Sequence, residues 1–186
     1  PGRDFAWATP RSLSPAMLRA LNPVNIRRLR LAAAWVLLAY LVSHFSNHAL
    51  GIISLKAMEA GRHWFLAVWR SPAGTVALYG AIAIHGVLAL WLLFQRPSLR
   101  MPLWEFWQYL LGLALPPLLA GHVTFSRFSW WWFGTDGSYA GSLLNYWVLE
   151  PLGGVRQAIT LIMAWTHACI GLHFALRFRP WYPRAK

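Results

Sequence analysis

Four long apolar blocks divide the chain, and each is long enough to cross a membrane as a helix. They cover residues 31–54, 74–95, 102–126 and 157–176, and the only charged residue in them is Glu105, near the start of the third. About 20 helical residues, rising about 1.5 Å each, cross the roughly 30 Å hydrocarbon layer of a bilayer. The pattern predicts an all-α fold, a transmembrane four-helix bundle with short interfacial helices.

The ends of these helices and the connections between them also carry signals. Asn22 followed by Pro23 is a helix start, so the first helix should begin before its apolar block. The pair Pro116-Pro117 should kink the third helix, because proline removes a backbone donor. We expect interfacial helices at 55–72, which has aromatic residues on one side, and at 143–150. Residues 129–141 combine an aromatic cluster with turn residues.

The basic residues set the expected orientation. Twelve of the 17 lie at the end of the bundle that holds both termini and the connection after residue 95, and five lie at the other end. The positive-inside rule then places both termini in the cytoplasm. We expect a cytoplasmic basic amphipathic segment at 1–30, a membrane domain at 31–178 and a cytoplasmic exit segment at 179–186. Because the chain starts at Pro1 without Met, we expect it to be processed or cut from a longer protein.

Composition agrees with a membrane protein and narrows its chemistry. Hydrophobic residues make up 58% of the chain, charged residues only 12%, and mean hydropathy is +0.42. The net charge of +12 is better explained by topology and anionic lipid than by nucleic acid, because the basic residues flank the apolar blocks. The single cysteine, Cys169, excludes an internal disulfide framework and haem attached through a C-x-x-C-H motif. We interpret Cys169 as a small packing residue.

Six of the seven histidines fall within or at the edge of a span, and every span has at least one. Coordinating side chains are costly in a bilayer and usually face the bundle interior for a purpose. Neutral imidazole is a good axial ligand for haem iron, and two imidazoles per iron suit electron transfer. A proton relay or a transition-metal site is disfavoured because no carboxylate lies deep in a span. For each of these histidines, a purely structural hydrogen bond between helices remains the alternative. The six are His44, His48, His85, His122, His167 and His173.

Depth along the helices predicts one of the pairs. His85 precedes Arg96 by 11 residues and His167 precedes Arg177 by 10, so both lie roughly 15 Å from the cytoplasmic helix ends. This match predicts an inner haem between the second and fourth helices.

The other pair is less certain by the same measure. His44 lies roughly 20 Å into its helix and His122 roughly 30 Å into its own. On depth alone His48 suits His122 better, although tilt and the proline kink reduce the mismatch.

Other residues are candidates for contacts with cofactors, each with a plain alternative. Arg28, Arg30, Arg96 and Arg177 suit the propionates of an inner haem and Arg127 those of an outer one, but topology explains these arginines equally well. Tyr40 and His48 lie one helical turn before and after His44 on the same face, where a quinone site and ordinary packing are both plausible. Small residues allow close approach of a flat macrocycle or of another helix; they are Gly80, Gly86, Gly112, Gly121 and Gly171.

Four segments in order resemble a known family. SHFSNHALGIISLKAMEAGR, IAIHGVLALW, LLAGHVTF and AWTHACIGLHFALR resemble the haem-ligand helices of the di-haem cytochrome b subunits of succinate dehydrogenases and fumarate reductases. The NHALG segment and the basic, aromatic exit LHFALRFRPWYPRAK resemble more closely the N-terminal membrane domain of certain bacterial class III adenylate cyclases.

The resemblance implies specific roles. The outer haem b would be held by His44 and His122 and the inner haem b by His85 and His167, and the resemblance thus favours His44 over His48. His48 and His173 would line the haem surroundings or a quinone site. The chain would exchange electrons with quinone and act as the redox-sensing anchor of a cytoplasmic cyclase region, in a homodimer in a bacterial inner membrane. The alternatives are an electron-transferring anchor of a succinate dehydrogenase or fumarate reductase-type complex, and a cofactor-free anchor.

Overall fold

The fold is entirely helical across the part of the chain that the structure describes. The computed structural model describes residues 22–135 and 137–182, and no strand occurs among them. The helices are α2 (Pro23–Ala49), α3 (Leu55–Trp69), α4 (Pro72–Phe94), α5 (Leu103–Val123), α6 (Ser129–Phe133), α7 (Tyr139–Leu144) and α8 (Pro151–Leu176). A 3₁₀ turn (Leu50–Ile52) follows α2, and π-helical turns follow α5 (Thr124–Phe128) and α7 (Asn145–Leu149).

The four predicted spans and the bundle class are confirmed. Four helices are long and apolar enough to cross a membrane: Val24–Ile52, Pro72–Phe94, Leu103–Phe133 and Pro151–Leu176. The protein is therefore a multi-pass membrane protein. The third span is longer than its apolar block because α5, the π-helical turn and α6 form one continuous helix.

Local capping explains where several helices start. The side chain of Asn22 accepts a hydrogen bond from the backbone N–H of Val24, with Pro23 in the first turn, which confirms the predicted early start of α2. Ser54, Ser71 and Ser138 cap α3, α4 and α7 in the same way. The predicted helix at 55–72 is confirmed as α3, whereas the one at 143–150 begins earlier, because the Ser138 cap starts α7 at Tyr139.

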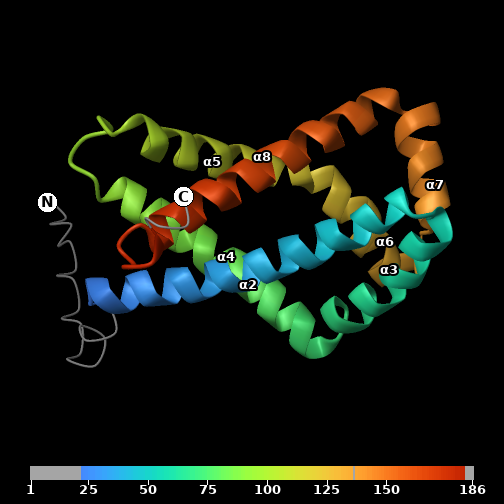
Figure 1. Cartoon of the computed structure of the whole chain (residues 1–186), viewed down its shortest axis with the longest axis horizontal. Coiled ribbons are helices and arrows are strands. Elements are labelled where there is room, and N and C mark those ends of the chain that lie inside the picture. The colour runs from blue at the N-terminus through green and yellow to red at the C-terminus, as the bar shows by residue number, and fades with distance from the viewer. Residues whose placement is uncertain (1–21, 136, 183–186) are drawn as a thin grey trace, which may run out of the picture.

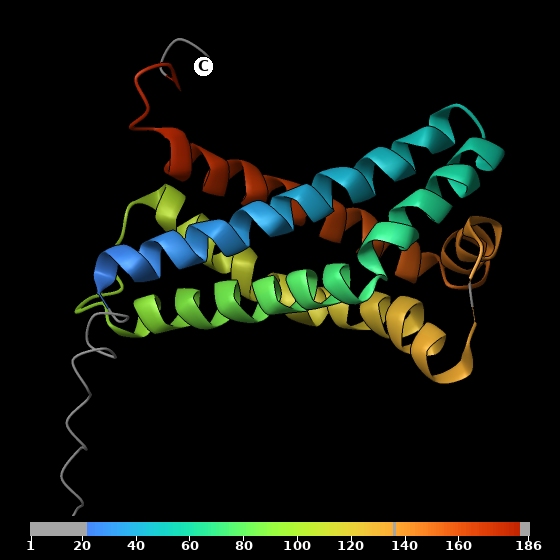
Figure 2. The ribbon, with the colours of Figure 1, turned by 90° about the horizontal axis from the view of Figure 1, so that it is seen from below.

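The spans form two closely packed pairs. Backbone contacts are most extensive between α2 and α4 and between α5 and α8. Among the described spans of different pairs, only α2 and α8 have an appreciable backbone contact, and that contact is small. Figures 1 and 2 show α2 crossing α8 obliquely rather than running parallel to it. The bundle interior therefore lies between two helix pairs that are joined mainly through side chains.

The two ends of the bundle differ. We call the end where α2 begins and α8 ends the terminal end, and the opposite one the capped end. Figure 1 shows α3, α6 and α7 gathered at the capped end, while at the terminal end only the turn from α4 to α5 joins spans. The capped end thus has most of the structure outside the spans.

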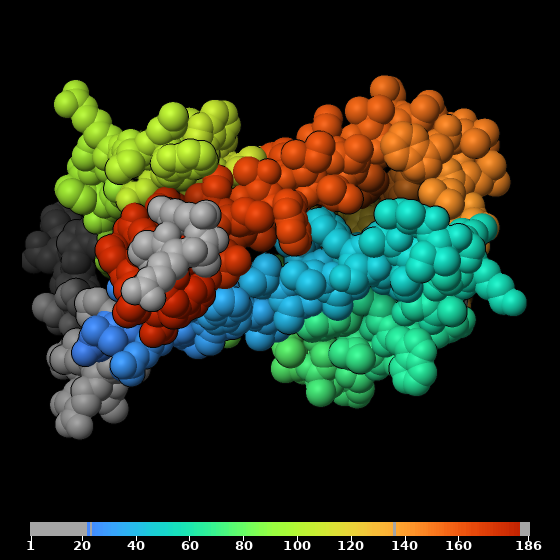
Figure 3. Space-filling model, in the orientation of Figure 1, coloured from blue at the N-terminus to red at the C-terminus, as the bar shows by residue number. Residues whose placement is uncertain are grey.

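The buried core is small for a chain of this length. Five hydrophobic side chains are buried among the described residues, together with two polar ones; they are Ala33, Met58, Leu78, Ala81, Ile170, Asn47 and Thr160. Many large apolar side chains face outward, as expected where lipid replaces water around the bundle. On the face shown in Figure 3, α8 lies beside α2 over the middle of the molecule and diverges from it toward the capped end.

Two predicted segments lie partly outside the described residues. Of the predicted N-terminal segment 1–30, the structure describes 22–30, which belong to α2. Of the predicted exit segment 179–186, it describes 179–182.

Candidate functional site

One pair of histidines joins α4 to α8 in the half of the bundle nearer the terminal end. The ring centroids of His85 and His167 are 6.3 Å apart, and the ring planes are nearly perpendicular at 85°. These two helices make no extensive backbone contact with each other. The structure therefore brings together the two residues that matched in depth, across the gap between the helix pairs.

The His167 ring is docked against the backbone of α5. Its Nδ1 lies 3.1 Å from the carbonyl oxygen of Gln108, and its Nε2 lies 3.4 Å from the amide nitrogen of the same residue. A carbonyl oxygen only accepts, so Nδ1 carries the proton and Nε2 presents its lone pair. A Cβ at Gly112 would lie 2.8 Å from Cε1 of His167, so the ring approaches this closely only because residue 112 is glycine.

His85 has a different environment. Its Nδ1 is buried without a hydrogen-bond partner, and its ring lies beside the backbone of Arg30 on α2. No atom lies within 4 Å of where a Cβ would stand at Gly80 or Gly86, on the same helix. The α4 side of this pair is thus less tightly packed than the α8 side.

A second pair of histidines joins α2 to α5 nearer the capped end. The ring centroids of His44 and His122 are 5.9 Å apart, with the planes at 67°. His44 is therefore the first-helix histidine that meets the ring of His122, in the pairing implied by family resemblance. Nδ1 of His44, like that of His85, is buried without a hydrogen-bond partner.

Tyr40 and His48 flank His44, as predicted from their spacing. The Tyr40 ring stacks on His44 at 5.5 Å and 14°, and Nε2 of His48 lies 3.3 Å from Nε2 of His44. Trp69 of α3 packs edge-on against Tyr40 at 5.1 Å and donates its indole N–H to the Ser43 hydroxyl. Phe65 of α3 lies 5.2 Å from the His44 ring, so His44 has neighbours both on its own helix and on α3.

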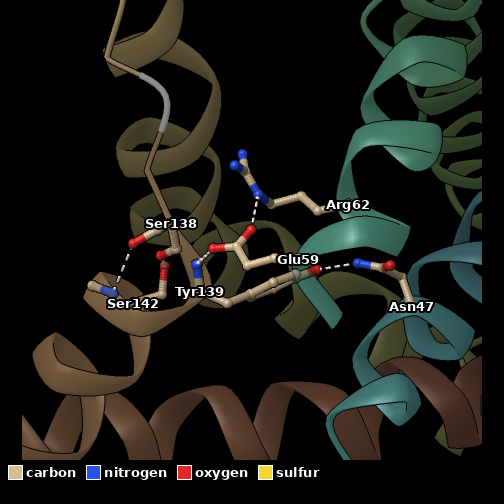
Figure 4. Close-up of polar contacts among 7 residues, drawn as sticks. Asn47, Glu59, Arg62, Ser138, Tyr139 and Ser142 are labelled. Atoms are coloured by element: carbon tan, nitrogen blue, oxygen red, sulfur yellow. Dashed lines mark hydrogen bonds and ion pairs between the residues drawn. The ribbon is translucent and has the colours of Figure 1, made fainter. Parts of the chain in front are cut away.

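A polar network beyond His48 fastens α3 and α7 to α2 (Figure 4). The amide of Asn47 donates to the Tyr139 hydroxyl, and the backbone N–H of Tyr139 donates to Glu59 at 2.6 Å. Glu59 also pairs with Arg62 at 2.5 Å. The Tyr139 ring lies edge-on to His48 at 5.2 Å, which connects the network to the flank of the His44–His122 pair. We call these residues the capping network: Asn47, Glu59, Arg62 and Tyr139.

Two pKa shifts follow from the capping network. Burial disfavours ionisation of Glu59, but the hydrogen bonds from Arg62 and from the Tyr139 backbone outweigh it, so the pKa of Glu59 lies below its ordinary 4.5. Burial raises the pKa of Tyr139, which stays a neutral phenol. At neutral pH the network is thus an ionised carboxylate held by a guanidinium and a backbone amide.

Three of the predicted propionate-binding arginines, Arg127, Arg177 and Arg96, have protein partners, and Arg28 lies on the surface. Arg30 is partly buried on α2, with its backbone beside His85. Arg127 donates to the Thr75 hydroxyl at 2.6 Å and lies over the Trp130 ring at 5.0 Å. Arg177 lies over Phe174 and Phe178, and Arg28 is exposed near the start of α2. Arg96 forms a 2.9 Å ion pair with Glu105.

His173, the remaining histidine of α8, lies apart from both pairs in contact with the end of the chain. Its Nδ1 is 3.0 Å from the Tyr182 hydroxyl, and the two rings are 5.6 Å apart. His173 therefore links the last helix to the segment that leaves it at the terminal end.

The spacing of both pairs suits two imidazoles bound to one iron. A metal–nitrogen bond of about 2 Å, with the nitrogen about 1 Å from the ring centre, puts the centres of two opposed imidazoles roughly 6 Å apart. The observed separations of 5.9 and 6.3 Å agree with that value. Each pair also contains a buried ring nitrogen without a hydrogen-bond partner, which is Nδ1 of His44 in one pair and Nδ1 of His85 in the other. The ring separations at both pairs are therefore compatible with two imidazoles on one iron, while Nε2 of His44 lies against His48 and both ring nitrogens of His167 lie against Gln108.

Three residues that contribute to these sites were missed by sequence reasoning. Gln108, Asn47 and Tyr139 are polar residues in or beside apolar segments, and each contacts a histidine or supports the helix that carries one. Buried polar side chains within a span are rare enough to signal a function. The sequence shows that Gln108 and Asn47 are polar residues within predicted spans, but it does not show which residues they contact.

No family model, curated protein or solved structure matches this chain. Within 22–135 and 137–182, no group of three or more His, Cys, Asp or Glu side chains is placed to hold a metal ion. A bis-histidine haem needs only two protein ligands, so it does not require such a group.

Proposed function

We propose that this chain is a di-haem b-type membrane cytochrome that exchanges electrons with the quinone pool. His44 and His122 bind one haem and His85 and His167 bind the other. The observation that carries the proposal is that both inter-helical histidine pairs have ring separations of 5.9 and 6.3 Å, close to that of two imidazoles on one iron. When bound, haem b supplies a one-electron carrier.

The packing of the spans supports this proposal. Each histidine pair takes one residue from the α2–α4 pair and one from the α5–α8 pair, where the backbones are not closely packed. Gly112, which touches the His167 ring, precedes His122 by ten positions, about 15 Å along the helix. The two sites therefore follow one another across the membrane.

The chain's own residues hold the imidazoles and exclude water. Gln108 orients His167, while Tyr40 and Phe65 pack against His44. Ionic groups at the ends close the bundle: the capping network at one end and the Arg96–Glu105 pair at the other. We place the terminal end in the cytoplasm, with the capped end outside, because of the distribution of basic residues; the bacterial cell is proposed from the family resemblance alone.

We further propose that the domain is the redox-sensing membrane anchor of an adenylate cyclase, in a homodimer. This proposal rests on the sequence resemblance; the contact between His173 and Tyr182 adds only that α8 is tied to the segment that follows it. Cyclase activity of a full-length protein that does not change between oxidised and reduced quinone pools would contradict the regulatory part. Co-purification with flavin and iron–sulfur subunits would instead indicate the anchor of a respiratory complex.

Optical spectroscopy of the detergent-purified chain tests the cytochrome. We expect b-type α and β bands after dithionite reduction and about two haems per chain. His63→Ala is the matched control for histidine substitution, because His63 is exposed on α3, and it should keep both haems. Protein produced with an ample haem supply that shows no Soret band would leave the histidines as structural hydrogen-bonding residues.

A further inference from the structure

The two histidines nearer the terminal end have unequal support. His167 has a partner for Nδ1, the Gln108 carbonyl at 3.1 Å, and an amide nitrogen at 3.4 Å from Nε2. His85 has a buried Nδ1 without a partner, and its ring has only a weaker interaction with the Arg30 backbone. Histidine ligands of metals nearly always donate the second ring N–H to a partner, which fixes the tautomer and makes the ligand more basic.

The backbone of α5 is shaped to accept this hydrogen bond. The Gln108 carbonyl belongs to the helical turn that Gly112 completes, and a Cβ at 112 would lie 2.8 Å from the His167 ring. Gly171, on α8, leaves room for the Gln108 carboxamide, which is 3.1 Å from where a Cβ would stand. Glycine on each helix thus lets the ring of His167 and the side chain of Gln108 pack into the crossing of α5 and α8.

We propose that the Gln108 carbonyl, exposed by Gly112, is the positioning group that makes His167 the fixed ligand of its haem and leaves His85 the displaceable one. The inference rests on the proposed function and goes beyond it, because it makes the two ligands of one iron inequivalent. It predicts that ligand exchange at this site occurs on the α4 side.

Imidazole rescue tests the inequivalence directly. In His167→Gly, added imidazole should occupy the vacated place and donate its second N–H to the Gln108 carbonyl. 1-Methylimidazole lacks that N–H, so it should bind roughly three- to tenfold more weakly, the usual range for one hydrogen bond. In His85→Gly the preference for imidazole should be smaller, because no carbonyl accepts a hydrogen bond from Nδ1 of His85. Binding is read from the optical spectrum, and the His44–His122 haem serves as an internal reference in both variants.

Gly112→Ala provides a second test. The added methyl group should push the His167 ring away from the carbonyl, which weakens the ligand and raises the midpoint potential of this haem while the other haem keeps its potential. The haem of the His44–His122 pair in the same protein is the internal control, because Gly112→Ala changes no residue that contacts that pair.

The outcomes separate this inference from the proposed function. Equal discrimination between the two imidazoles in both glycine variants would overturn the inference, as would unchanged potentials in Gly112→Ala. Wild-type protein without haem would instead contradict the proposed function itself. If Gly112→Ala does not fold, the imidazole comparison decides alone, because it leaves Gly112 in place.

Discussion

The two histidine pairs have similar spacing but are supported in different ways. In the half nearer the terminal end, support comes from the backbone. The Gln108 carbonyl binds His167, and the absence of a side chain at Gly112 lets the ring approach α5. At the capped half, support comes from side chains: Tyr40 stacks on His44, and His48 connects it to Tyr139 of the capping network. A site supported by backbone depends on the crossing of two spans, whereas one supported by side chains depends on the short helices outside the membrane. We therefore expect perturbations of the connections to affect one site and perturbations of the α5–α8 crossing to affect the other.

The largest effect should come from removing ligands. His44→Ala and His122→Ala should each lose the same haem, and His85→Ala and His167→Ala should each lose the other, so that each variant retains about one haem per chain. Reduced-minus-oxidised spectra with haem quantification measure this. His48→Ala should keep two haems; its loss of the haem that His122→Ala loses would instead make His48 the ligand.

Separating α3 from α2 should have the next largest effect. A Cβ at Gly61 would overlap the Asn47 carboxamide and lie 2.5 Å from Cδ1 of Leu50, so Gly61→Ala should destabilise the protein by about 1–3 kcal/mol. The haem of the His44–His122 pair should be lost or shifted in potential first. Thermal unfolding and redox titration check this against Gly137→Ala, whose Cβ would meet no atom within 4 Å. Equal damage at both haems would contradict separate support.

Acid should weaken the capping network through Glu59. Its pKa is lowered in the folded protein, so its contribution is present above about pH 4.5 and is lost as the pH falls through the folded-state pKa. Glu59→Gln should lower stability by about 1–2 kcal/mol at pH 7, and the difference from wild type should shrink on acidification. Unfolding midpoints across this pH range test the sign. A difference that grows toward low pH would exclude the ionised network.

The smallest effect should come from the ion pair at the terminal end. Arg96 and Glu105 lie 2.9 Å apart, but both side chains are accessible to solvent. Exposed ion pairs contribute little to stability. Glu105→Gln should therefore leave the unfolding midpoint and both haem potentials essentially unchanged. A clear shift in the potential of the His85–His167 haem would show that the terminal end also relies on side-chain support.

The hydrophobic pattern predicts the spans, whereas the residue at which a helix starts depends on capping side chains and on proline in the first turn. The block 157–176 was identified, but α8 begins six residues earlier at Pro151, a position suited to proline in the first turn. The start of α2 was predicted because Asn22-Pro23 was recognised as the same type of signal.

The partners within the site were harder to predict than its histidines. Asn47 and Tyr139 are 92 positions apart, and their contact depends on how α7 folds back over the end of α2. Depth along the helix favoured His48 for His122, but the structure pairs the ring of His122 with His44. Such contacts depend on how each helix is rotated about its axis and on the angle at which two helices cross. A distance measured along a straight helix gives no information on either.

The division of the spans into two pairs has a consequence for biogenesis. During synthesis α2 and α4 enter the membrane first, and neither can complete a site, because each histidine pair needs a residue from the later half. The His44–His122 site becomes possible when α5 is inserted, while the His85–His167 site must wait for α8. Under the proposed function, the order of synthesis would therefore set an order of haem loading, in which the last helix to enter the membrane completes the last site.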